Sequence, residues 1–134
     1  MATEETTHDA EAVDGWTPEV DMILSALDAA WADPGERRGS RRTPYRVIAR
    51  LELYSDQNES APWTVFVRDI DASGLGFITR TQLPLGYGAR VSIEAPSGEE
   101  VEIASTILRC RTCSTGWFEG ALTFNRRQNQ FKLD

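Results

Sequence analysis

The pattern of apolar residues changes its period once along the chain, near residue 47. Before that point, apolar residues recur three and four positions apart, at Val20, Ile23, Leu24, Leu27 and Trp31. This spacing predicts one apolar stripe on a helix, and Thr17 followed by Pro18 is typical of a helix start. We therefore predict an N-terminal amphipathic helix over residues 16–33. We expect its stripe to pack on the core of this chain, with a partner-binding face as the alternative.

After residue 47, apolar residues alternate with polar ones, which is typical of strands with two unlike faces. The first such strand has one apolar side, formed by Val47, Ala49, Leu51 and Leu53. Five further segments have strand character: residues 63–70, 75–81, 89–95, 100–111 and 116–124. Six strands joined by short turns, without helical crossovers, predict an all-β fold that is either an antiparallel barrel or a compact sandwich.

The bulk composition fits one ordinary globular domain. The chain has 134 residues, of which 40% are hydrophobic and 26% are charged. It contains no apolar run long enough to span a membrane and no start typical of a signal peptide, so we expect a cytoplasmic protein. The polar, acidic beginning predicts a disordered tail over residues 1–15. We assign the barrel domain to residues 34–126 and a C-terminal tail to residues 127–134.

Charge is distributed unevenly along the sequence. Residues 1–36 carry ten acidic residues and neither lysine nor arginine, whereas residues 37–134 carry eleven acidic and fourteen basic residues. Thirteen of the fourteen basic residues are arginines. A guanidinium is a planar, bidentate donor that suits phosphate oxygens and the acceptor edge of guanine. The preference for arginine therefore favours binding of a ligand that carries such groups.

Residues 36–47, which we call the arginine loop, contain five arginines: Arg37, Arg38, Arg41, Arg42 and Arg46. Three pairs of them satisfy the pattern R-x-x-x-R, namely 37 with 41, 38 with 42, and 42 with 46. Gly39 and Pro44 favour an irregular loop over a helix, so this segment is suited to wrapping around an anion.

A second group of ligand-type residues follows the arginine loop. Asp71, Ser73 and Gly76 form the pattern D-x-S-x-x-G. A carboxylate accepts the N1–H and N2–H donors of guanine, and a hydroxyl supplies a further hydrogen bond. A glycine leaves room for a ligand to approach the backbone. Together the two groups predict a binding site for an anion that also carries guanine.

Catalysis and metal binding find little support in the sequence. The single histidine, His8, lies in the polar tail, so no Ser-His or Cys-His arrangement is available. Asp69 and Asp71 are the remaining candidate pair for a hydrolase, but they are equally explained if one accepts hydrogen bonds and the other caps the turn. Cys110 and Cys113 form a lone CxxC without further ligands or a following helix. We expect free thiols in a strand, no metal and no enzymatic activity.

The sequences RRTPYRV and DASGLGF resemble the motifs of the PilZ family, which are bacterial six-stranded barrels that bind the second messenger cyclic di-GMP. The resemblance covers most of residues 37–124 and extends to VRDIDASGLGFIT and to the closing GWFEGALTF. It implies a six-stranded antiparallel barrel preceded by the N-terminal helix. The sequence departs from the family at its end, because NRRQNQFKLD does not offer the C-terminal helix that the family often adds.

The resemblance also implies a set of ligand-binding residues. The second family motif matches Asp71, Ser73 and Gly76. For the first motif we favour Arg42 and Arg46, because an aromatic residue before the second arginine and a strand directly after it are similar to the family's usual YRV. The full set is Arg42, Arg46, Asp71, Ser73 and Gly76, with Arg41 and Arg38 as auxiliary ligands.

The function that the resemblance implies is that of a cyclic di-GMP receptor. In this interpretation, the nucleotide orders the arginine loop and moves the N-terminal helix, which changes what a downstream protein partner binds. It requires no cofactor other than the ligand, no membrane and no nucleic acid, and we expect a monomer or a weak dimer. One alternative is a PilZ-like interaction adaptor that does not bind the nucleotide. Another is an RNA- or DNA-binding barrel, which the pI of about 4.7 disfavours.

Overall fold

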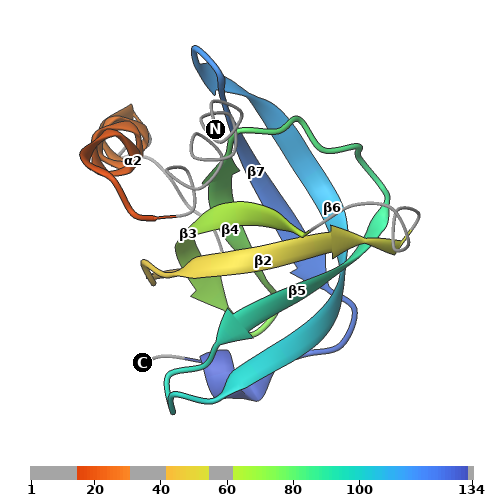
Figure 1. Ribbon diagram of the computed structural model, residues 1–134. Coiled ribbons are helices and arrows are strands. Elements are labelled where there is room, and N and C mark those ends of the chain that lie inside the picture. The colour runs from red at the N-terminus through yellow and green to blue at the C-terminus, as the bar shows by residue number, and fades with distance from the viewer. Residues whose placement is uncertain (1–14, 31–41, 55–61, 133–134) are drawn as a thin grey trace, which may run out of the picture. The chain divides into compact units, whose positions relative to one another are not determined.

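The computed structural model of the protein describes residues 15–30, 42–54 and 62–132 (Figure 1). The chain divides into two compact units, residues 1–36 and residues 37–134. Three of the five arginines of the arginine loop, Arg37, Arg38 and Arg41, lie outside the described residues. The predicted acidic tail also lies outside them, except for Gly15.

The first unit contains one described helix, α2 (Pro18–Ala30), where the amphipathic helix was expected. Thr17 caps this helix, because the backbone N–H of Val20 donates to its Oγ1 at 3.3 Å. The buried positions of the helix are Val20, Ile23 and Leu24, all of them members of the predicted stripe. The helical period of the sequence is therefore confirmed. The predicted end of the helix lies outside the described residues.

The second unit contains the strands β1 (Thr43–Pro44), β2 (Ile48–Leu53), β3 (Trp63–Asp71), β4 (Gly74–Thr79), β5 (Gly88–Glu94), β6 (Glu100–Ser114) and β7 (Trp117–Phe124). Neighbouring strands pair antiparallel in the order β3-β2-β5-β6-β7-β4, and β4 pairs back onto β3 (Figure 1). This closes a six-stranded barrel. The predicted all-β fold is confirmed as an antiparallel barrel rather than a sandwich.

The short strand β1 is the element that the alternation of apolar residues did not predict. It pairs with Asp69 and Ile70 of β3, directly beside the stretch of β3 that pairs with β2. The end of the arginine loop therefore continues the edge of the barrel on which β2 lies. Because of this pairing, the described end of the loop is extended at Thr43 and Pro44 rather than helical.

The barrel core consists mainly of inward-facing residues from the six strands, joined by Leu83, Ala95 and Phe131 from outside the strands. In β2, the buried residues are Ala49, Leu51 and Leu53, as the alternation predicted. Close packing also explains a glycine. A Cβ atom on Gly120 of β7 would lie 2.7 Å from the ring of Phe77 in β4, so a glycine at this position gives the ring its space.

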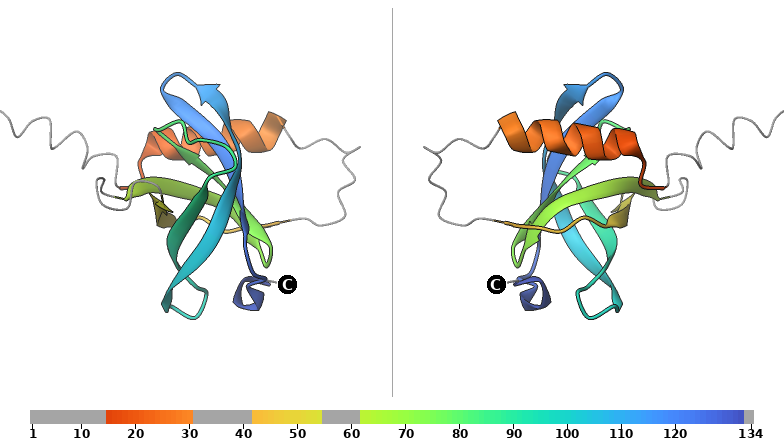
Figure 2. Two further views of the ribbon diagram at one scale, coloured as in Figure 1. Left: turned by 90° about the vertical axis from the view of Figure 1, so that its right-hand side faces the viewer. Right: turned by 90° about the vertical axis from the view of Figure 1, so that its left-hand side faces the viewer.

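A 3-10 turn, η2 (Asn129–Phe131), closes the end of the barrel at which β3 turns into β4 (Figure 2). Phe131 is fully buried and belongs to the core. Its ring centroid lies 6.2 Å from that of Phe124 and 5.9 Å from that of Tyr45. The predicted domain boundary at residue 126 therefore leaves out a residue of the barrel core.

Candidate ligand-binding site

The Asp71 turn, which comprises residues 71–74, joins β3 to β4 and is held together by one carboxylate oxygen. Asp71 Oδ1 accepts hydrogen bonds from the backbone N–H of Ser73 at 2.8 Å, from its hydroxyl at 2.7 Å and from the N–H of Gly74 at 3.0 Å. A short acidic side chain that satisfies backbone donors two and three residues ahead is typical of a capped turn. The prediction that one aspartate caps the turn is confirmed for Asp71.

The Asp71 carboxyl is held in its ionised form by its surroundings. Partial burial raises its pKa, but the hydrogen bonds from Ser73, the charge of Arg42 and the hydrogen bond from Gly74 outweigh this effect. The pKa of Asp71 therefore lies below its ordinary value. The charge of Arg42, at the described end of the arginine loop, is therefore one of the causes that lower the pKa of Asp71.

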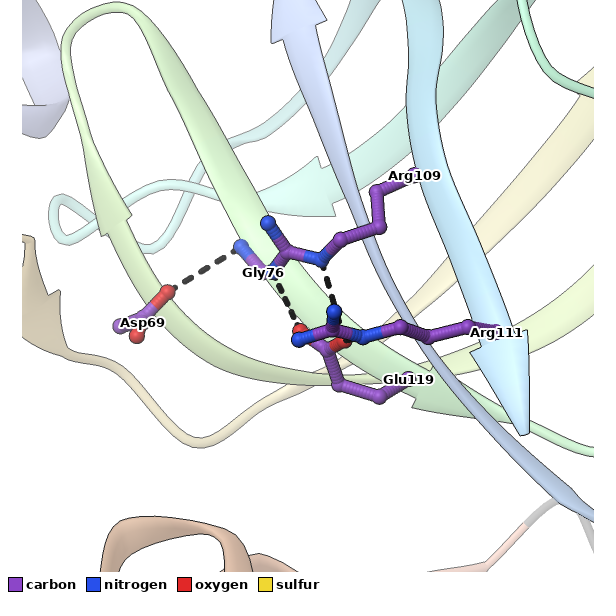
Figure 3. A network of polar contacts seen from close by, with 5 residues as sticks. All are labelled: Asp69, Gly76, Arg109, Arg111 and Glu119. Atoms are coloured by element: carbon purple, nitrogen blue, oxygen red, sulfur yellow. Dashed lines mark hydrogen bonds and ion pairs between the residues drawn. The ribbon is translucent and has the colours of Figure 1, made fainter. Parts of the chain in front are cut away.

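Asp69 has the second of the two predicted roles, as a hydrogen-bond acceptor. Its Oδ1 accepts the backbone N–H of Gly76 at 3.1 Å, across the β3–β4 pair (Figure 3). A Cβ atom on Gly76 would lie only 2.7 Å from this oxygen. A side chain at Gly76 would therefore displace the Asp69 carboxylate, so packing within the protein favours glycine at this position of the D-x-S-x-x-G pattern whether or not a ligand binds.

The described part of the arginine loop runs extended along β3. Thr43 pairs with Ile70, and the backbone N–H of Tyr45 donates to the carbonyl of Arg68 at 3.0 Å. The register against β3 shifts by one residue between Pro44, which pairs with Asp69, and Ile48, which pairs with Phe66. The segment that carries Arg42 and Arg46 is therefore held beside β3 without forming a helix.

Arg42 carries an unsatisfied donor. Within the described residues, its Nε is a buried side-chain nitrogen without a hydrogen-bond partner. Buried donors are nearly always paired, so an orphaned guanidinium N–H calls for an explanation. A bound anion at this position would supply the missing acceptor. Arg42 and Arg46 both lie within the described residues, whereas each of the two alternative R-x-x-x-R pairs includes a residue outside them, so the choice of Arg42 and Arg46 stays a prediction.

Tyr45 anchors the arginine loop to the barrel, and the sequence pattern pointed to it only as the aromatic residue before the second arginine. Its hydroxyl donates to the carbonyl of Glu94 at 2.6 Å, and its ring meets that of Phe131 edge-on at 75°. These contacts fix the backbone directly before Arg46 and three residues after Arg42. The signal in the sequence was an aromatic residue placed between two arginines, which indicates a buried anchor in an otherwise polar loop.

The strand register leads from the candidate site across the barrel to Glu119, a buried carboxylate that pairs with two arginines of β6. Asp69, Gly76, Ala121 and Arg109 are consecutive partners in one row over β3, β4, β7 and β6. Beside this row, Arg109 and Arg111 both donate to Glu119, whose side chain is only 2% exposed (Figure 3). Alternation did not predict this burial, because the partners come from a different strand.

Within the described ranges, no group of three or more His, Cys, Asp or Glu residues is arranged to hold a metal ion. Cys110 and Cys113 are free thiols of β6, as predicted, and burial raises the pKa of both. In the same part of the chain, no helix has the length and apolar character needed to cross a membrane.

Comparison with known proteins identifies one family. The model of the PilZ domain matches residues 36–131, a range that includes the arginine loop, the Asp71 turn and Phe131. No curated protein sequence gives a significant match.

Three solved structures are similar to the chain. The Bacillus subtilis inhibitor of motility, MotI/DgrA, is 14% identical with a TM-score of 0.54, over 69% of this chain and 44% of that one, and shows a shared fold. The PilZ domain of CeSA from a cellulose-synthesising bacterium is 16% identical with a TM-score of 0.48, over 66% of this chain and 84% of that one. MrkH of K. pneumonia in its apo state is 18% identical with a TM-score of 0.47, over 72% and 44%. The chain spans less than half the length of MotI/DgrA and MrkH.

Proposed function

The chain belongs to the PilZ domain family, and we propose on the geometry of its site that it is a receptor for cyclic di-GMP. The observation that carries this proposal is the orphaned, buried Nε of Arg42 beside the ionised Asp71. The Arg42 guanidinium has one N–H that lacks an acceptor, and the Asp71 carboxylate accepts two backbone N–H groups. The two side chains belong to the arginine loop and to the Asp71 turn. Cyclic di-GMP carries phosphates and guanines, which are the groups that these two side chains are suited to bind.

Each site residue has a distinct role in this proposal. Arg42 and Arg46 contact the phosphates and the N7/O6 edge of a guanine. The Asp71 carboxylate accepts the N1–H and N2–H donors of a guanine, and its lowered pKa keeps it ionised at neutral pH. The Ser73 hydroxyl donates a hydrogen bond to Asp71, so its oxygen can still accept a hydrogen bond from the ligand. Arg38 and Arg41 act as auxiliary ligands.

The response to the ligand begins in the arginine loop, because this loop lies between α2 and β2 in the chain and contains β1. Binding orders the loop and restricts the position of the helix that precedes it, which changes the surface offered to a downstream protein partner. The differential affinity of the nucleotide for the ordered state is the driving force of this change. The receptor works in the cytoplasm, carries out no reaction and needs no cofactor besides the nucleotide.

One observation favours a second candidate function, an interaction adaptor that does not bind the nucleotide. Asp71, Ser73 and Gly76 all have structural reasons within the fold, because they form the capped turn and accommodate the Asp69 carboxylate. An intact D-x-S-x-x-G pattern is therefore compatible with a barrel that has lost its ligand. The orphaned donor of Arg42 is what favours the receptor over the adaptor.

Isothermal titration calorimetry with cyclic di-GMP separates the two functions. We expect the parent protein to bind, and Arg42→Ala, Arg46→Ala and Asp71→Ala each to bind about 10- to 100-fold more weakly, the range expected for loss of a charge-assisted hydrogen bond. Arg90→Ala is the matched control, because Arg90 pairs with Glu52 on β2 instead of lying at the site. No heat with the parent would favour the adaptor, and binding that survives all three site variants would place the ligand elsewhere.

A further inference from the structure

The segment after β7, residues 125–131, which we call the C-terminal segment, lies against the Asp71 turn. The backbone N–H of Gln128 donates to the carbonyl of Ala72 at 2.8 Å. Just before the segment begins, the N–H of Phe124 and the hydroxyl of Thr123 both donate to the carbonyl of Ser73, at 2.8 and 3.1 Å. The backbone of the turn is therefore held from the C-terminal side by three hydrogen bonds.

The same segment also lies against the arginine loop. Phe131 is fully buried, and its ring meets that of Tyr45 edge-on at 5.9 Å. Tyr45 is fixed on its other sides by the hydrogen bonds from its hydroxyl to Glu94 and from its N–H to Arg68. The position of Phe131 is itself defined by the η2 turn, in which its N–H donates to the carbonyl of Gln128 at 3.0 Å.

Gln128 thus connects the two halves of the candidate site through a short path of contacts. On one side its N–H reaches the Asp71 turn, and on the other its carbonyl holds Phe131, which supports Tyr45. Tyr45 stands between Arg42 and Arg46 in the chain, so a displacement of Tyr45 moves both guanidinium groups relative to Asp71. The distance between the two halves decides whether one ligand can contact both, since misplacement by about 1 Å is costly for such contacts.

We propose that Phe131 is a positioning residue for the nucleotide site, and that the C-terminal segment holds the arginine loop and the Asp71 turn at the separation which the ligand requires. This inference rests on the proposed function for its ligand, but the contacts themselves do not depend on a ligand. Phe131 acts through Tyr45 and does not touch the nucleotide. Because coupling between two sites is reciprocal, a ligand that bridges both halves also stabilises the C-terminal segment.

Amide hydrogen exchange without ligand tests the positioning role by itself. In Phe131→Ala we expect the amides of Tyr45 and Gln128 to exchange at least about tenfold faster relative to the slowest barrel amides, as expected of local opening. Phe131→Leu, which restores most of the apolar volume, should recover part of this protection. Leu53→Ala is the matched control, because it also removes a buried apolar side chain, but at the last residue of β2, whereas Tyr45 precedes the first. Acceleration of Tyr45 and Gln128 to the same extent in Leu53→Ala would overturn the proposal.

Titration with cyclic di-GMP then tests the link to the ligand. We expect the affinity to fall at least about tenfold in Phe131→Ala and to recover partly in Phe131→Leu, with Leu53→Ala close to the parent once the folded fraction is taken into account. In the parent, ligand should slow exchange at Gln128. Equal affinity of the parent and Phe131→Ala would overturn the positioning role. Absence of binding by the parent would refute the receptor function alone, because the exchange measurement without ligand still decides whether Phe131 positions Tyr45.

Discussion

Single carboxylates organise the backbone around the candidate site. Asp71 satisfies two backbone donors and a hydroxyl with one oxygen, and Asp69 satisfies the N–H of Gly76. These side chains were visible in the sequence as an Asp pair beside a glycine-containing turn, which is why both roles could be predicted. The orphaned donor of Arg42 could not be predicted, because it depends on what surrounds one nitrogen atom after folding.

The ionised state of Asp71 predicts a dependence of stability on pH. Its folded-state pKa lies below the ordinary value of 3.8, so its charge stabilises the fold above about pH 4, and this contribution is lost as the pH falls through the folded pKa. Urea unfolding should show that the free energy of unfolding of the parent falls more steeply than that of Asp71→Asn between about pH 5 and about pH 2. Parallel pH profiles for the two proteins would show that the turn gains nothing from the ionised carboxyl.

The strands were predicted closely from their alternation, because that signal is local. β1 and η2 were not predicted, since a two-residue strand and a three-residue turn have no period of their own. The burial of Phe131 could not be predicted, because a single aromatic residue in a polar stretch is a weak signal. Its ring packs against those of Tyr45 and Phe124, which lie elsewhere in the sequence. The burial of Glu119 is likewise explained only by its pairing with β6.

The packing of β4 on β7 predicts that two neighbouring glycines differ in their tolerance of a side chain. A Cβ atom on Gly74 would collide with the backbone carbonyl of Leu122, which cannot move without the strand, whereas one on Gly76 would meet only the movable end of Asp69. We expect Gly74→Ala to lower the free energy of unfolding by about 3 kcal/mol, and Gly76→Ala by about 1 kcal/mol through the lost hydrogen bond.

Urea unfolding of the two variants measures this difference. Asp69→Ala provides the control background, because removing that carboxylate should make Gly76→Ala nearly neutral while leaving the cost of Gly74→Ala unchanged. If Gly76→Ala were the more damaging of the two in the parent, the contact with the Leu122 carbonyl would not be the limiting one.

For the whole molecule, the sequence places all fourteen lysine and arginine residues after residue 36 and ten of its acidic residues within residues 1–36. The two compact units meet in the sequence within the arginine loop. The residue types of the two motifs predicted one shared candidate site, and the resemblance to a family made that prediction specific. The pairing of β1 with β3, which brings the described end of the arginine loop beside Asp69, could not be predicted from the sequence because it is not local.

Titration of isotope-labelled protein with cyclic di-GMP, followed by amide chemical shifts, tests whether the nucleotide binds between the arginine loop and the Asp71 turn. We expect the largest shift changes at Tyr45, Ser73, Gly74 and Gly76, with little change at Tyr87 and Leu108, which are exposed residues outside the arginine loop and the Asp71 turn. Shift changes concentrated at Tyr87 and Leu108, or none at any ligand concentration, would contradict this binding site.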